Sequence, residues 1–421
     1  MEELFWVSVA VLVQTYVAFP LVTIVRGRLF GRDVLVGDIT PSISVVIAAH
    51  DEATSIGPKL HSVLDADYPV DLVEVIVASD GSADGTPEAA AIDPRVRVLV
   101  LPRVGKAAAL NAAITASRQD VLVFTDANSR FAPDALRKIV RPLADPEVGG
   151  VAGDQRYEPP AAAASGLPGS GTVDGERRYW DFDRILKEAE SAGGNVIGAT
   201  GALYAVRREL VGTVPEGVTD DFTTSTGVIE QGHRLVFAGD ATVFEPVAAS
   251  TDAEFRRKVR VMTRGLAAVA YRRRLLDPRE QGFYAYQLIN HKVLRRLMGI
   301  PLLTALAASA ACSRRRPIYR VALAGQLAVY VPGALALAHP SGRIGRSRLG
   351  GLAGYFCMVN GAGLVAAWNI VSGRRIVHWE PERTDGDVTI DLTDRALGAE
   401  GGSETATGTG TAADADTEVP R

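Results

Sequence analysis

The sequence of 421 residues lacks the signatures of several protein classes. It has two cysteines, Cys312 and Cys357, both inside apolar runs and without metal-ligand spacing, which argues against a disulfide framework and a zinc site. Basic residues do not exceed acidic ones, at 45 against 49, so nothing in the charge points to a nucleic-acid partner. We find no Walker-type phosphate loop, no Ser-His-Asp or Cys-His set and no internal repeat. The composition, 47% hydrophobic and 22% charged, excludes wholesale disorder.

Long apolar runs are what the sequence has instead. The mean hydropathy of +0.11 is high for a soluble enzyme. Residues 4–25 carry no charge, and a helix of this length is sufficient to cross a bilayer core. Two glutamates precede the run and three arginines follow it, which argues against a cleaved signal peptide. The positive-inside rule then predicts an N-terminus outside the cell and residue 26 onward in the cytosol.

Three further charge-free stretches occupy 297–313, 321–342 and 349–373. The first is short and contains Pro301, so it is at the lower limit for a span. If all three stretches cross the bilayer, the C-terminus ends outside; if the first lies in the interface, the C-terminus ends inside. We favour the interfacial arrangement, because it places seven of the ten flanking arginines on the cytosolic side.

The segment between these membrane parts alternates short apolar runs with helical patterns. We predict strands at 43–49, 73–79, 96–101 and 120–125, helices after the first, third and fourth strands, and a weaker helix around 86–91. Near-continuous Val, Ile and Leu runs separated by helices indicate an α/β domain with a mostly parallel sheet and helices on both faces. A stretch rich in Pro, Gly, Ser and Ala, 158–175, is predicted to be a loop.

Acidic residues follow three of the predicted strands. Asp51-Glu52, Asp80 and Asp126 each stand at the carboxyl end of a different strand. One such residue is ordinary, because aspartate favours turns. Ligands of parallel sheets bind at the carboxyl ends of the strands, so three of them would converge on one crevice.

The motifs around these residues resemble a known family. The segments SVVIAAHDEATSI, VIVASDGSADGT, GKAAALNAAI, VFTDAN and VTDDF, in this order and spacing, are similar to family 2 glycosyltransferases. The likeness is strongest to the membrane-embedded cellulose, chitin, hyaluronan and poly-N-acetylglucosamine synthases, and it covers about residues 40–275. The resemblance implies the nucleotide-sugar glycosyltransferase A fold and inverting transfer from a UDP-sugar.

The resemblance assigns three residues to the nucleotide sugar. Asp80 matches the aspartate that accepts hydrogen bonds from uracil or ribose, although Asp-Gly is also a turn dipeptide. Glu52 occupies the acidic position of the first motif, or else begins a surface helix. Lys106 opens a helix, where a cation is mildly unfavourable, so we interpret it as a diphosphate or uridine contact rather than a solvated surface lysine.

Asp126-Ala127-Asn128 stands where the family has an Asp-x-Asp pair. The resemblance implies that Asp126 and Asn128 hold Mg²⁺ or Mn²⁺, which neutralises the diphosphate leaving group, and that Asp126 also belongs to the nucleotide-sugar site. Asn128 departs from the pattern, because its amide oxygen can ligate a metal but brings no charge. Diphosphate oxygens and water would then complete the coordination.

Thr219-Asp220-Asp221 resembles the family's Thr-Glu-Asp motif, whose last residue is the general base. Asp221 would therefore take the proton from the acceptor hydroxyl as that oxygen attacks the anomeric carbon. Asp220 is assigned to the acceptor side. The alternative is structural: Thr219 could cap a helix whose first turn favours two acids.

Other acceptor-side residues follow from the same resemblance. Gly201, in TGALYAVRR, could let the backbone approach the acceptor sugar, or could serve a strand turn. In place of the family's Gln-x-x-Arg-Trp motif stands RKVRV, where Arg260 matches the arginine that binds diphosphate, Arg257 replaces Gln and Val261 replaces Trp. The loss of Trp leaves acceptor identity and processive elongation open. The alternative is a basic amphipathic helix lying on anionic lipid.

Five segments summarise the expected organisation. They are an N-terminal transmembrane helix with a basic flank (1–36), a cytosolic glycosyltransferase domain (37–250), basic amphipathic interface helices (251–296), a C-terminal membrane region with one interfacial or short helix and two transmembrane helices (297–375), and a disordered acidic tail (376–421). Trp180 and His233 are interpreted as structural.

The expected protein is a multi-pass plasma-membrane enzyme that adds sugar from a UDP-sugar to a β-linked polysaccharide. Two alternatives stay open: transfer of a single sugar to a lipid acceptor, and a catalytically inactive nucleotide-binding scaffold of a secretion complex. The expected partners are the lipid bilayer, the donor and a polysaccharide or glycolipid acceptor, with an export partner or oligomer as a further possibility and no nucleic acid.

Overall fold

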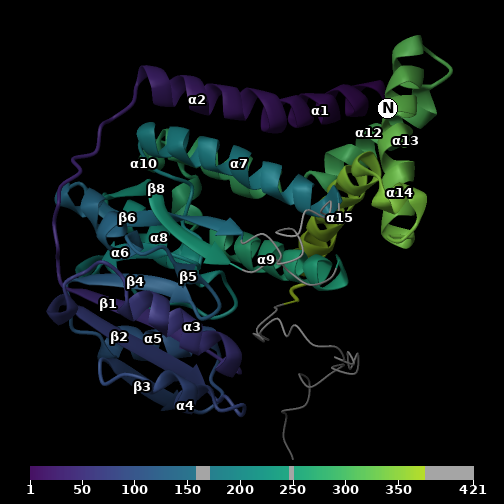
Figure 1. Cartoon of the computed structure of the whole chain (residues 1–421). Coiled ribbons are helices and arrows are strands. Elements are labelled where there is room, and N and C mark those ends of the chain that lie inside the picture. The colour runs from purple at the N-terminus through teal and green to yellow at the C-terminus, as the bar shows by residue number, and fades with distance from the viewer. Residues whose placement is uncertain (158–170, 246–250, 375–421) are drawn as a thin grey trace, which may run out of the picture. The chain divides into compact units, whose positions relative to one another are not determined.

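A computed structural model describes residues 1–157, 171–245 and 251–374. Within these residues, one sheet has the strand order β3-β2-β1-β4-β7-β6-β8-β5 (Figure 1). The strands are β1 (Ile43–Ala49), β2 (Val73–Asp80), β3 (Val96–Leu101), β4 (Val121–Asp126), β5 (Arg130–Phe131), β6 (Val148–Tyr157), β7 (Tyr204–Arg207) and β8 (Arg234–Glu245). The four strands predicted from the sequence are thus confirmed to within one residue at each end.

The sheet is mostly parallel. Strands β3, β2, β1 and β4 run parallel to one another, and β6 runs parallel to β8. Strand β7 is antiparallel to both β4 and β6, and the two-residue β5 is antiparallel to β8. Every residue of β1 is buried, as expected for a central strand with both faces covered.

Helices cover both faces of the sheet. Val45 and Ile47 of β1 pack toward α3 (Ala53–Leu64) and α6 (Ala135–Val140), while Val46 and Ala48 face α5 (Lys106–Ala116) and α8 (Asp220–Glu230). The predicted helices are confirmed, including the weak one, α4 (Thr86–Ala90). Short 3-10 segments complete the domain: η2 (Val70–Leu72), η3 (Arg141–Ala144) and η4 (Arg208–Leu210).

One predicted loop is partly wrong. Residues 158–170 lie outside the described residues, but α7 (Gly171–Ala192) includes the last five residues of the predicted loop, 171–175. The predicted tail, 376–421, also lies outside the described residues, as do the side chain of Trp180 and that of every other residue in 171–181.

Among the described residues, three helical spans are long and apolar enough to cross a membrane. The first, Glu2–Leu29, is continuous through α1 (Glu2–Val13), a π-helical segment η1 (Gln14–Ala18) and α2 (Phe19–Leu29). The other two are α13 (Pro317–Ala338) and α15 (Arg348–Val371), joined through α14 (Arg343–Arg346). These three match the predicted runs that begin at residues 4, 321 and 349.

A bent helical region connects the catalytic domain to the last two spans. It comprises α9 (Thr251–Tyr271), η5 (Arg273–Leu276), α10 (Pro278–Gln281), α11 (Phe283–Leu288), η6 (Ile289–Leu294) and α12 (Gly299–Cys312). The segment Phe283–Leu294 and α12 meet at 64°, which is compatible with a broken span as well as with an interfacial arrangement. The interfacial placement of this region stays a prediction.

The N-terminal helix is fixed to the catalytic domain. Its second half, α2, runs alongside α7 (Figure 1). A Cβ atom at Gly27 would lie 2.6 Å from the carbonyl oxygen of Ala189, so only glycine permits this approach. Arg234 on β8 donates hydrogen bonds to the carbonyl groups of Arg32 and Asp33, just after the helix. The domain and its first membrane-type helix therefore share packed contacts.

Candidate active site

The carboxyl ends of β1, β2 and β4 lie at one edge of the sheet. The register pairs Ala48 of β1 with both Ala78 of β2 and Asp126 of β4. The loops that carry Glu52, Asp80 and Asp126 therefore emerge side by side. The predicted convergence of acidic residues at one edge is confirmed.

Hydrogen bonds join the loop after β1 to the loop after β2. Asp51 adopts a left-handed conformation with φ of 51°, and its carboxylate accepts a hydrogen bond of 2.9 Å from the backbone N–H of Ala83. The N–H of Glu52 donates to the hydroxyl of Thr86 at 2.8 Å. Burial raises the pKa of Glu52, and the charge of Asp126 adds to this increase. The negative charge of Asp126 thus acts on Glu52, as expected for acidic residues on neighbouring loops.

Asp80 is fully buried at the end of β2. Its Oδ1 accepts hydrogen bonds from the backbone N–H groups of Val104 at 2.6 Å and Gly105 at 2.9 Å. Gly105 has φ of 89°, a conformation that favours glycine. Asp80 therefore holds the loop that leads into Lys106. Its direct contact with the nucleotide stays a prediction.

Lys106 joins two carboxylates from distant parts of the chain. Its Nζ lies 2.9 Å from Oδ1 of Asp126 and 3.1 Å from Oδ2 of Asp220. Burial alone would lower the pKa of Lys106, but the two carboxylates outweigh burial and raise it above the ordinary value. Burial likewise acts to raise the pKa of Asp220, yet Lys106 and Arg264 together hold it below its usual range. A cation thus links the end of β4 to the start of α8.

Asp221 stands beside Asp220 in the first turn of α8. Burial and the charge of Asp220 raise the pKa of Asp221 to about 6, while a hydrogen bond of 2.7 Å from the N–H of Phe222 and the ammonium of Lys292 oppose the increase. A carboxyl with this pKa is deprotonated at neutral pH and more basic than an ordinary aspartate. These properties suit a general base.

The structural alternative for the Thr219-Asp220-Asp221 motif accounts for only part of it. Thr219 occupies the N-cap position of α8, but its side chain makes no capping hydrogen bond. Its Oγ1 is buried and, among the described residues, has no hydrogen-bond partner; the same holds for Oγ1 of Thr200. Unpaired buried hydroxyls are costly in a folded protein, and an ordered water or a bound polar group can satisfy them.

Gly201 lies against Asp126. A Cβ atom at this position would lie 2.5 Å from Oδ2 of Asp126. The absence of a side chain at Gly201 therefore makes room for the carboxylate. Contact of Gly201 with an acceptor sugar stays a prediction.

The two arginines at the position of the family's Gln-x-x-Arg-Trp motif lie on α9. Arg257 makes an ion pair of 2.8 Å with Glu254 on the same helix, and Arg260 is half-buried one turn later. Neither assignment, Arg257 to the acceptor or Arg260 to diphosphate, is tested by these contacts. Arg264, which the motifs did not single out, donates two hydrogen bonds, at 3.1 and 2.7 Å, to the carbonyl of Val218.

The sequence motifs did not point to two further residues near the site. Lys292, on η6, belongs to the surroundings of Asp221, and Lys59 is buried beneath the Asp126 turn. Neither follows a recognisable motif. Arg264 had a weak signal, because it continues the basic helical pattern of residues 256–264.

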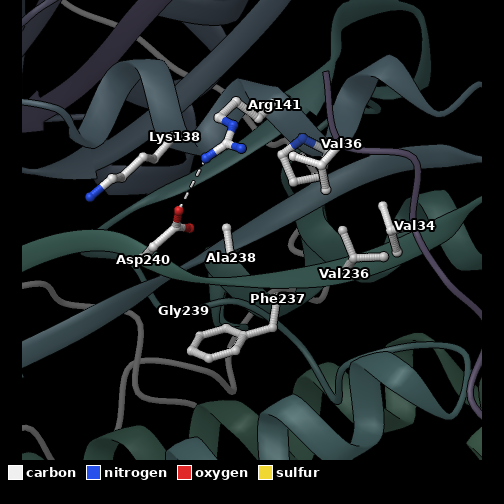
Figure 2. A pocket seen from close by; sticks show the side chains of 10 residues that line it. Val34, Val36, Lys138, Arg141, Val236, Phe237, Ala238, Gly239 and Asp240 are labelled. Carbon is white, nitrogen blue, oxygen red and sulfur yellow. Dashed lines mark hydrogen bonds and ion pairs between the residues drawn. The ribbon is translucent and has the colours of Figure 1, made fainter. Parts of the chain in front are cut away.

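A cavity of about 360 Å³ lies elsewhere on the domain (Figure 2). Val34 and Val36, from the segment after the N-terminal helix, form one wall, and Phe237 on β8 contributes to another. Arg141 and Asp240 form an ion pair of 3.5 Å at its side. It shares no residue with the carboxylate site, so the chemistry described above does not depend on it.

Comparison with known proteins identifies the family. The family described as glycosyl transferase family 2 matches residues 44–212. An N-acetylglucosaminyltransferase from Bradyrhizobium elkanii is 33% identical over 124 residues, which are 28% of this chain and 68% of that protein. The chain belongs to glycosyltransferase family 2. The predicted family is thus confirmed. Four of the five motifs that carried the prediction lie within the matched region, and VTDDF, at 218–222, follows it.

One further relative and one solved structure are also similar to this family 2 glycosyltransferase. The succinoglycan biosynthesis protein ExoO from Rhizobium meliloti (strain 1021) is 38% identical over 106 residues, 24% of this chain, and the match spans only 30% of ExoO. The mannosyltransferase PcManGT from Pyrobaculum calidifontis, solved in complex with GDP-Man and Mn²⁺, superposes with a TM-score of 0.66 and 26% identity, covering 88% of this chain and all of PcManGT. The glycosyltransferase A fold is confirmed.

Proposed function

We propose that this family 2 glycosyltransferase is a membrane-bound inverting enzyme that transfers a sugar from a UDP-sugar to a growing β-linked polysaccharide. The observation that carries the proposal is the linked set Asp126, Lys106, Asp220 and Asp221 at the carboxyl edge of the sheet. It combines positive charge for a diphosphate with a carboxylate of raised pKa for an acceptor hydroxyl.

Asp221 is the proposed catalytic base. It accepts the proton of the acceptor hydroxyl while that oxygen forms a bond to the anomeric carbon of the donor. The bond from that carbon to the diphosphate breaks on the opposite side, so the configuration inverts and the nucleoside diphosphate leaves. Asp220 stays ionised because of Lys106 and Arg264, and its charge keeps Asp221 basic.

A divalent cation fits the donor side of this site. The oxygens of Asp126 and Asn128 are hard ligands of the type that Mg²⁺ and Mn²⁺ prefer. The Asp126 side chain is 32% exposed, and the place beside it already stabilises the positive charge of Lys106. The described residues contain no cluster of three acidic, His or Cys side chains that could hold a metal alone, so phosphate oxygens and water would complete the ligands. Such an ion, when bound, neutralises the diphosphate.

Glu52, Asp80, Lys106 and Arg260 are the proposed nucleotide-sugar residues, beside Asp126. The name of ExoO supports a polysaccharide product, and the N-acetylglucosaminyltransferase relative supports an N-acetylhexosamine donor. The GDP-Man bound to PcManGT makes GDP-mannose the competing donor. Gly201, Asp220 and Arg257 are the proposed acceptor-side residues.

Transfer of one sugar to a lipid is the second candidate. A specific residue favours it: Val261 replaces the tryptophan of the family motif and is 44% exposed, so it offers no aromatic platform for an acceptor sugar. The three apolar helical spans support a plasma-membrane location with a cytosolic catalytic domain, which gives access to both acceptors. An export partner or an oligomer would supply the path for a polymer.

The deciding experiment measures nucleotide release from purified protein in lipid vesicles. UDP-glucose, UDP-N-acetylglucosamine, UDP-glucuronate and GDP-mannose are supplied in turn with Mn²⁺, with Mg²⁺ and with EDTA, and the products are sized. Release with one UDP-sugar and a ladder of products supports the polysaccharide synthase, whereas a single glycolipid supports the second candidate. UDP binding without release from any donor would instead support the inactive scaffold.

A further inference from the structure

A lysine is fully buried directly beneath the Asp126 turn. Lys59 lies on α3 and has no exposed surface. Its Nζ donates hydrogen bonds to Oγ1 of Thr125 at 2.6 Å and Oγ of Ser129 at 3.2 Å. The face of the Phe131 ring lies 3.6 Å from Nζ and is left for the third N–H. Lys59 thus has a partner for each of its donors.

The burial of Lys59 has a cost in stability. No ion pair among the described residues involves Lys59, so its burial carries a desolvation penalty without a carboxylate in contact. Burial lowers the pKa of Lys59 well below its ordinary value, against the attraction of Asp126 and Glu245. A neutral amine still has two N–H groups, so both hydroxyl contacts persist in either protonation state. An apolar residue would fill this space at lower cost.

The partners of Lys59 connect two turns of the active site. Oγ of Ser129 donates a hydrogen bond of 3.0 Å to the carbonyl of Asp126, which fixes the first turn. Oγ1 of Thr125 donates a hydrogen bond of 2.6 Å to the carbonyl of Ala202, in the turn that contains Gly201. One buried amine thus holds together the turn that carries the proposed metal ligands and the turn that packs against them.

The spacing of these turns is tight. A single added carbon at Gly201 would collide with Asp126, so a small shift between the turns changes the place of the Asp126 carboxylate. We propose that Lys59 is a positioning residue, which sets the separation of the Asp126 and Gly201 turns and thereby the affinity for the diphosphate of the donor. This inference rests on the proposed function.

Lys59→Met tests the inference, because methionine keeps the length of the side chain and removes its donors. We expect the kcat/KM for the donor to fall roughly 10- to 100-fold, since misplacement of a binding group by about 1 Å has effects of this size. The thermal midpoint should stay at or above the wild-type value. Lys138→Met is the matched control, because Lys138 lies on α6 and pairs with Asp134 at the surface; it should leave kcat/KM unchanged.

A second variant removes the hydrogen-bond partner of Lys59 instead of Lys59 itself. Thr125→Val removes the hydroxyl that connects Lys59 to Ala202, and it should lower kcat/KM like Lys59→Met; the double variant should be no worse than the more damaging single one. Additive losses, or wild-type kinetics in Lys59→Met, would overturn the inference. If Lys59→Met does not fold, Thr125→Val decides alone, since wild-type kinetics there also overturn it.

Binding separates this inference from the proposed function. The affinity for UDP in the presence of Mn²⁺, measured by calorimetry, should be weaker in Lys59→Met and unchanged in Lys138→Met. A wild-type protein that binds UDP but transfers no sugar would refute the proposed transfer, while the affinity difference would still uphold Lys59. Equal UDP affinity in wild type and Lys59→Met would refute the role of Lys59 alone.

Discussion

Two carboxylates of the candidate site, Asp80 and Asp220, are held in different ways. On the donor side, the carboxylate of Asp80 accepts hydrogen bonds of 2.6 to 3.1 Å from backbone N–H groups of a neighbouring loop, and the guanidinium of Arg103 lies farther away, at 3.6 Å. On the acceptor side, Asp220 is balanced by side-chain cations from α5 and α9, namely Lys106 and Arg264. Backbone donors fix a carboxylate in one place. Side-chain cations can exchange partners when a charged substrate arrives.

This difference indicates that donor binding can change the ion pairs of Asp220 more readily than the hydrogen bonds of Asp80. Lys106 belongs to both sides, because it touches Asp126 and Asp220 at once. A diphosphate beside Asp126 would compete for the ammonium, and its partial release from Asp220 would leave the charge of that carboxylate less compensated next to Asp221. Donor binding would therefore make the base stronger at the moment when it is needed.

Removal of the proposed base should have the largest effect. Asp221→Asn keeps the shape of the side chain but abolishes its basicity, and we expect sugar transfer to fall by roughly 10²- to 10⁴-fold. UDP affinity should change little, because the donor side is intact. Glu216→Gln is the matched control, since Glu216 is exposed on the loop before α8. Transfer at the wild-type rate in Asp221→Asn would refute the assignment of the base.

Removal of the cation shared by Asp126 and Asp220, Lys106, should have the second-largest effect on sugar transfer. Lys106→Met leaves Asp126 and Asp220 without the ammonium between them, so we expect a loss of about 100-fold in kcat/KM. The pKa of Asp220 should rise in this variant, because burial is then opposed by Arg264 alone among the cations named. NMR titration of the carboxyls would detect the rise. An unchanged titration would mean that the two sides of the site are not linked through Lys106.

A side chain at Gly201 should displace the carboxylate of Asp126 and so disturb the proposed metal site. Gly201→Ala forces Asp126 to move, because the new carbon would lie 2.5 Å from its Oδ2. We expect a weaker response to Mn²⁺ and a loss of roughly tenfold or more in kcat/KM. Gly212→Ala is the control, as no atom lies within 4 Å of its Cβ position. Identical metal titrations for the two variants would contradict the tight contact.

The pH dependence should show the smallest effect. Asp221 must be deprotonated to accept a proton, and burial with the charge of Asp220 raises its pKa to about 6. We therefore expect kcat/KM to be level above about pH 7 and to fall about tenfold by pH 5, as the base becomes protonated. The profile is measured with a donor whose diphosphate does not titrate in this range. A level profile down to pH 5 would show that the base has an ordinary pKa.

Much of the fold could be read from the sequence because its signals are local. The runs of Val, Ile and Leu in β1, β2 and β4 are mostly buried on both faces, so apolar residues dominate them and they are easily recognised. The start of α7 was misplaced, because its first turns are rich in Gly, Thr and polar residues that also favour loops. The interfacial or spanning nature of α12 depends on its surroundings and not on its own residues.

The sequence by itself determined the family, the parallel sheet and the acidic residues at its carboxyl edge, since motif order and strand periodicity are properties of neighbouring residues. Tertiary structure alone decided which charges meet. Asp220 lies 114 positions after Lys106, and Lys59 lies 66 positions before Thr125, yet both pairs are in contact. Such pairings depend on the order of strands in the sheet and on the packing of helices over it, which no local pattern encodes.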